Sequence, residues 1–104
     1  MIRRSMDKTE IFLLTKPPHS DPTKMCLQLM RHSENVVLYL AGDGVYNLLD
    51  AATLQALPME RILASKEDLE ARGVQAEDIA IVPKDFYRLL VECMMTDGSR
   101  IYTF

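Results

Sequence analysis

The sequence has few cysteines, no long apolar run and no surplus of basic charge. Its 104 residues include two cysteines, Cys26 and Cys93, which do not make a disulfide framework and lack the C-x-x-C spacing of a dithiol redox centre. No apolar run approaches the ~18 residues of a membrane span. A net charge of −3 and a pI of 5.3 exclude the basic footprint of a nucleic-acid-binding domain. We therefore expect a cytoplasmic protein that contacts neither membrane nor nucleic acid directly.

Motifs for binding phosphate or metal are also missing. Gly42-Asp43-Gly44 lacks the third glycine of a dinucleotide-binding turn, and the chain contains no G-x-x-x-x-G-K-[ST] segment. The two histidines, His19 and His32, have no second ligand at a metal-binding spacing. We expect no cofactor and no metal, and we interpret Gly42-Asp43-Gly44 as a tight turn that needs a positive φ.

The overall amino-acid composition is typical of one globular domain. Hydrophobic residues make up 48% of the chain and charged residues 26%. A single domain commonly has about 100–150 residues, so we expect one domain over residues 1–104. Residues 1–8 are basic but meet Glu10 before any apolar stretch, which does not predict a signal peptide.

Short apolar runs alternate with capped helical segments along the chain. The runs that predict strands cover residues 11–15, 36–40, 61–64, 79–82 and 101–104, and helices are predicted at 21–32, 45–49, 66–72 and 84–95. Asp21 is the expected N-cap of the first helix, and Gly73 the left-handed end of the third. This alternation predicts a small three-layer α/β/α domain with a mainly parallel sheet of four to five strands.

The loops beyond the carboxyl ends of such strands are where ligands gather in an open parallel sheet. They cover residues 16–21, 41–44, 65–66 and 83–84. Glu67 and Asp68 follow one of these loops, in the first turn of a predicted helix. There the helix dipole favours carboxylates, so we interpret them as solvated rather than as a catalytic pair.

Cys26 is the one candidate for nucleophilic chemistry, and two interpretations of it stay open. Its neighbours Met25, Leu29 and Met30 favour a thiol packed in the core. The nearby helix N-terminus favours instead a lowered pKa and a sulfur-accepting thiolate. Cys93 lies on the apolar face of the last predicted helix, where we expect it to be buried.

Four ordered stretches carry a resemblance to a known family. They are residues 11–18 (IFLLTKPP), 38–46 (LYLAGDGVY), 64–74 (ASKEDLEARGV) and 85–91 (DFYRLLV). The set resembles the DsrH/TusB family of sulfur-relay subunits, within the DsrE-DsrF-DsrH superfamily. It matches that family's first strand with a K-S-P turn, its strand ending in D-G-V, its E-D-x-x-A-R-G helix and its D-F-x-x-L-V helix. Residues 1–9 resemble an extension beyond the family's usual start, and the chain lacks the tryptophan often found near the family's end.

The resemblance implies a compact α/β/α subunit that assembles with paralogous DsrE-like and DsrF-like subunits, commonly as a heterohexamer. Such a complex passes persulfide sulfur to a sulfur-carrier protein, for tRNA 2-thiouridine formation or for dissimilatory sulfur metabolism. The sulfur-carrying DsrE/TusD subunits have a cysteine after the third strand, and the corresponding position here is Ser65. Because serine cannot hold a persulfide, the resemblance implies an accessory subunit of a sulfurtransferase complex.

Cys26 is similar in place to a first-helix cysteine of some DsrH proteins, which makes it the candidate persulfide acceptor of this chain. A second interpretation assigns the same fold but no sulfur-transfer activity. In that case the chain is a stand-alone homo-oligomeric binding module, since a fold does not fix a function.

Overall fold

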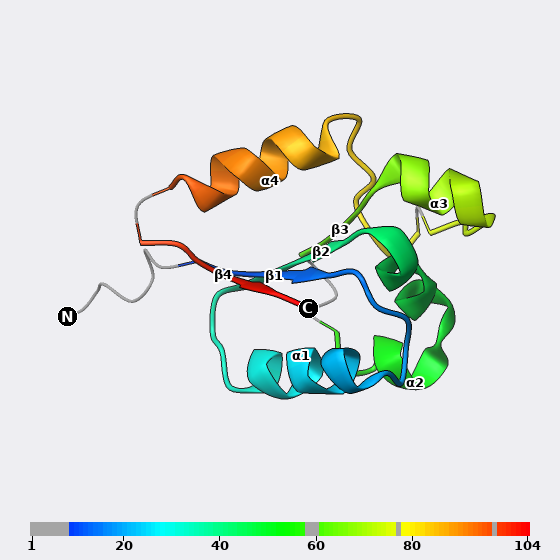
Figure 1. Ribbon diagram of the computed structural model, residues 1–104, viewed down its shortest axis with the longest axis horizontal. Helices are drawn as coiled ribbons and strands as arrows, with labels where there is room; N and C mark the ends of the chain where they lie inside the picture. The colour runs from blue at the N-terminus through cyan, green and yellow to red at the C-terminus, as the bar shows by residue number, and fades with distance from the viewer. Residues whose placement is uncertain (1–8, 58–60, 77, 97) are drawn as a thin grey trace.

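The computed structural model describes residues 9–57, 61–76, 78–96 and 98–104, so the predicted extension over residues 1–9 lies almost wholly outside the described residues. Strands alternate with helices in the first two thirds of the chain as expected, whereas α3 is followed by α4 with no full strand between them (Figure 1). In chain order the elements are β1 (Glu10–Leu14), α1 (Asp21–Arg31), β2 (Val36–Leu40), the 3₁₀ helix η2 (Gly42–Leu49), α2 (Ala51–Leu54), β3 (Ile62–Ala64), α3 (Lys66–Arg72), α4 (Phe86–Met94) and β4 (Arg100–Thr103).

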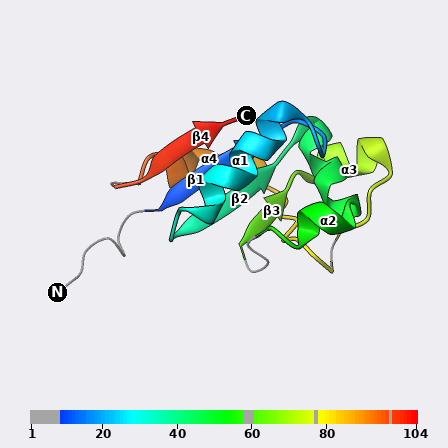
Figure 2. The same ribbon diagram turned by 90° about the horizontal axis from the view of Figure 1, so that it is seen from below.

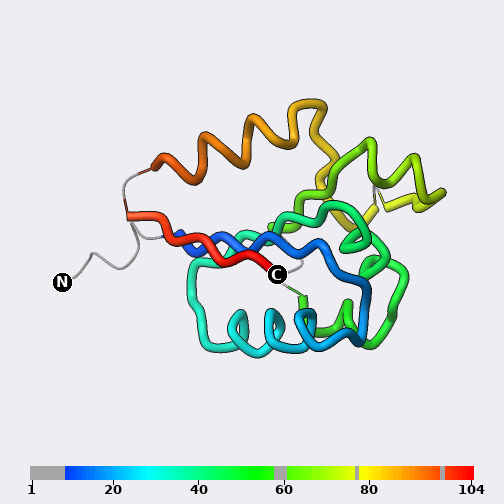
Figure 3. Tube along the Cα trace, in the orientation of Figure 1, coloured from blue at the N-terminus to red at the C-terminus, as the bar shows by residue number. Residues whose placement is uncertain are grey.

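The sheet has four strands in the order β3-β2-β1-β4, and every neighbouring pair is parallel. The predicted parallel sheet is therefore confirmed. All five residues of β2 are buried, as expected for a strand covered on both faces. Figure 3 follows the chain as it leaves α4 and returns to the sheet as β4 beside β1.

The strand predicted over residues 79–82 is reduced to a single bridge between Ile81 and Leu63. Two local causes explain the difference. The amides of Ile79 and Ala80 both donate to the carbonyl of Ala76, which turns the chain just before the bridge. Pro83 follows directly and has no N–H to extend the ladder.

Helices cover both faces of the sheet and give the three predicted layers (Figures 1 and 2). Successive side chains of a strand point to opposite faces. On the α1 side, Phe12 and Leu38 pack in the larger apolar cluster. On the α4 side, Tyr39 belongs to a smaller cluster with Phe86 and Leu90.

The helix ends differ from the prediction at α1, η2 and α4: η2 begins at Gly42 rather than at residue 45, and α2 was not predicted. The N-cap of α1 is Ser20, whose Oγ accepts from the Thr23 amide, so the predicted cap Asp21 is wrong and is instead the first helical residue. The predicted end of α3 at Gly73 is confirmed, with a φ of 66°. Helix α4 begins at Phe86 rather than at residue 84, because the two residues before it form a turn.

Candidate functional site

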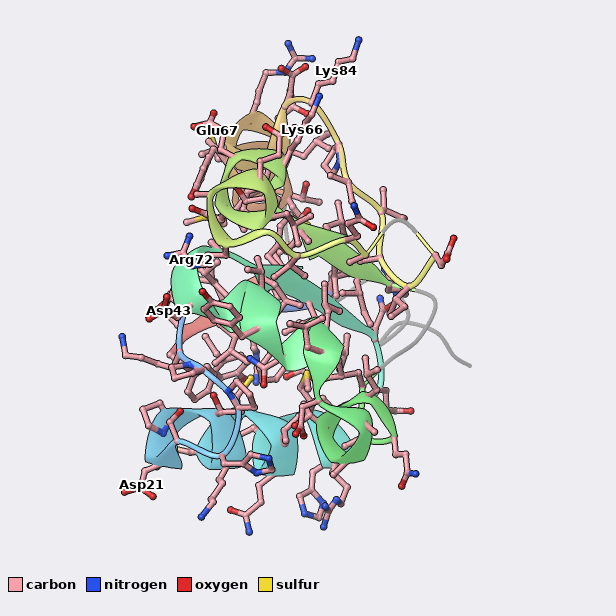
Figure 4. The ribbon with its side chains drawn as sticks, turned by 90° about the vertical axis from the view of Figure 1, so that its right-hand side faces the viewer. Asp21, Asp43, Lys66, Glu67, Arg72 and Lys84 are labelled. Carbon is pink, nitrogen blue, oxygen red and sulfur yellow. The ribbon has the colours of Figure 1, made fainter. Side chains whose placement is uncertain are left out.

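The carboxyl ends of β2 and β3 lie side by side, and their loops are joined by a network centred on Asp68 of α3. The Gly42 amide, just after β2, donates to Asp68 Oδ2 at 2.9 Å. Arg72, one turn further along α3, donates from Nη1 to Asp68 Oδ1 at 3.4 Å and from Nε to Asp43 Oδ1 at 3.1 Å. Figure 4 shows Arg72 and Asp43 close together at this edge. The expectation that Asp68 is merely solvated is corrected by these contacts, whereas Glu67 is exposed.

The Gly42-Asp43-Gly44 segment is shaped by packing against the end of β1. Gly42 has a φ of +54°, which confirms the predicted positive φ, and the segment forms the first turn of η2 rather than a separate turn before it. A Cβ on Gly44 would lie 2.0 Å from the carbonyl oxygen of Leu14, a distance no side chain can occupy. Gly44 therefore lets the first turn of η2 rest directly on the backbone at the end of β1, whereas Gly42 is needed for its positive φ.

Ser65 directly follows β3 and is the N-cap of α3. Its side chain is buried, with only 2% of the residue exposed, and its Oγ accepts from the Asp68 amide at 3.4 Å. The residue lines a hollow of about 220 Å³ between the start of α3 and the start of α4. The other lining residues are Lys66, Glu67, Pro83, Lys84, Asp85, Phe86, Tyr87 and Arg88.

The hollow offers hydroxyl, ammonium, guanidinium and carboxylate groups but no sulfur nucleophile. Neither cysteine and neither histidine is among its lining residues, so Ser65 has no imidazole base beside it there. Across the described part of the chain, no group of three His, Cys, Asp or Glu side chains could hold a metal ion. The arrangement positions loops and presents a polar surface that includes the carboxylates of Glu67 and Asp85.

Tyr87 connects α4 to the same network. Its hydroxyl donates to Asp68 Oδ2 at 3.5 Å. Burial, and then the negative charge of Asp68, raise the pKa of Tyr87. Asp68 thus receives hydrogen bonds from the β2 loop, from its own helix and from α4.

Cys26 lies away from this hollow, in the apolar cluster on the α1 side of the sheet. It is fully buried, and this burial raises the pKa of its thiol to about 12. The structure thus shows a packed thiol at Cys26, and does not bring it together with Ser65.

Cys93 is only half-buried, which is less than predicted from its place on the inner face of α4. It packs against the cluster that contains Tyr39. Burial, with a smaller contribution from Cys93, raises the pKa of Tyr39 to about 12. Neither cysteine is disulfide-bonded.

The sequence interpretation missed the network around Asp68. A signal for part of it was present, because Asp68 and Arg72 are four residues apart and such residues are neighbours on a helix surface. The contacts to Gly42 and Asp43 span 26 and 29 residues, and no local pattern indicates them.

Fold and site together define a small α/β domain with a parallel sheet. The Asp68 carboxylate binds the loop at the carboxyl end of β2, and Ser65, at the carboxyl end of β3, lines the hollow beside it. A family model described as "DsrH like protein" matches residues 16–96, most of the chain. The chain belongs to the DsrH-like family, as the resemblance predicted, and this membership implies a sulfur-relay subunit. A search of curated proteins finds no match. Among the described residues, no helix has the length and apolar character needed to cross a bilayer.

Proposed function

We propose that this chain is an accessory subunit of a cytoplasmic sulfurtransferase complex that handles protein persulfides. Its partners are DsrE-like and DsrF-like subunits and a sulfur-carrier protein, in tRNA 2-thiouridine formation or in dissimilatory sulfur metabolism. The observation that carries the proposal is Ser65, which lines the hollow. The resemblance to the family implies that its position corresponds to that of the cysteine of sulfur-carrying subunits. A persulfide forms on a thiolate sulfur, which a serine hydroxyl does not supply.

The contacts of the site support a scaffolding role. Ser65 caps α3, Asp68 binds the Gly42 amide, and Arg72 joins Asp68 to Asp43. These groups hold the loops after β2 and β3 at one edge of the sheet, which keeps that surface in a fixed shape for a neighbouring subunit.

Cys26 is a candidate persulfide acceptor only if the core around it opens. Its thiol is fully buried and its pKa is about 12, so almost none of it is thiolate at neutral pH. The full burial and the raised pKa both support a structural role for Cys26 in the core. Whether Cys26 also accepts sulfur is tested by the transfer assay with Cys26→Ala described below.

Exposed apolar side chains support assembly with other subunits. They occur on α1 and η2 as well as on α4, at Met25, Leu29 and Leu49 among others. Large apolar side chains left exposed on a domain are a common feature of protein–protein contacts.

Co-expression with DsrE-like and DsrF-like subunits of the same organism, followed by native mass spectrometry, tests the proposal. We expect this chain in a mixed assembly, and we expect sulfur transfer to the carrier to fall when this chain is left out. A Cys26→Ala variant is the matched control, and it should assemble and support transfer as the wild type does. A chain that forms only homo-oligomers, with transfer unaffected by its omission, would contradict the proposal and favour the stand-alone binding module.

A further inference from the structure

We draw no further inference here: the strongest candidate, the groove of about 860 Å³ between α1 and α2 that is lined by Met30, Arg31 and Arg61 among others, carries no proposal because nothing in the structure shows what covers it.

Discussion

Chemical modification of Cys26 distinguishes a packed thiol from a sulfur carrier. Burial raises the pKa of this thiol from an ordinary value of 9.0 to about 12. A shift of that size lowers the thiolate fraction at neutral pH by roughly a thousandfold, since each pKa unit is a factor of ten. Full burial adds a steric barrier to any reagent. Alkylation of Cys26 in the folded protein should therefore be limited by unfolding.

The assay is a time course with iodoacetamide at pH 7.5, read by peptide mass spectrometry with and without urea. Cys93 is half-buried and serves as the internal comparison. We expect Cys93 to be alkylated in the native protein, and Cys26 only when urea unfolds the chain. Native alkylation of Cys26 at the rate of a free model thiol would refute the reasoning.

Substitution of Cys26 adds an energetic test of the same site. Cys26→Ser buries a hydroxyl among apolar groups, and we expect a loss of about 1–3 kcal/mol in the free energy of unfolding. Cys26→Ala removes the sulfur without adding a polar group and should cost only about 1 kcal/mol. Urea unfolding measures both, and a serine variant as stable as the alanine variant would show that the site is not apolar.

The remaining predictions concern the loops and pH. Gly44→Ala should cost about 3 kcal/mol or more, because its Cβ would overlap the Leu14 carbonyl. Gly42→Ala has room and should lose only about 1–2 kcal/mol from its left-handed φ, so equal costs in urea unfolding would refute this account of the turn. Hydrogen bonds from Thr53, and then from His19, lower the pKa of Asp50 to about 2. The stabilisation that ionised Asp50 gives the folded protein is present above pH 3.8 and is lost as the pH falls toward 2. Asp50→Asn should therefore flatten the acid side of a plot of Tm against pH. An unchanged slope would contradict this role of Asp50. On the alkaline side, stability should fall as the pH rises from 9 toward 12 because the unfolded chain ionises Cys26 first, and the same plot for Cys26→Ala should fall less.

The fold could be predicted from the sequence because its signals are local. The apolar run of β2 predicts a strand buried on both faces, and Gly73 predicts the left-handed end of α3. The first cap was assigned wrongly because Ser20 and Asp21 are both good N-cap residues. The choice depends on tertiary contacts, since Ser20 Oγ also donates to the Pro17 carbonyl and so ties the preceding turn to the helix.

The site could be predicted only in part because its contacts are distant in sequence. The position of Ser65 after β3 follows from the local pattern, and so does its role as a cap. The burial of Ser65 and the bonds from Gly42 and Tyr87 to Asp68 depend on how α3 and α4 lie over the sheet edge. The same limit explains Cys93, whose exposure depends on how α4 lies on the sheet.

The most direct test of the accessory role is the mass of each subunit after the assembled complex is loaded from a persulfide donor. The account predicts that the added sulfur is on a partner subunit, that Cys26 keeps its unmodified mass, and that transfer to the carrier continues in a Cys26→Ser complex that is folded and assembled. A stoichiometric sulfur adduct on Cys26, together with loss of transfer in that variant, would contradict it.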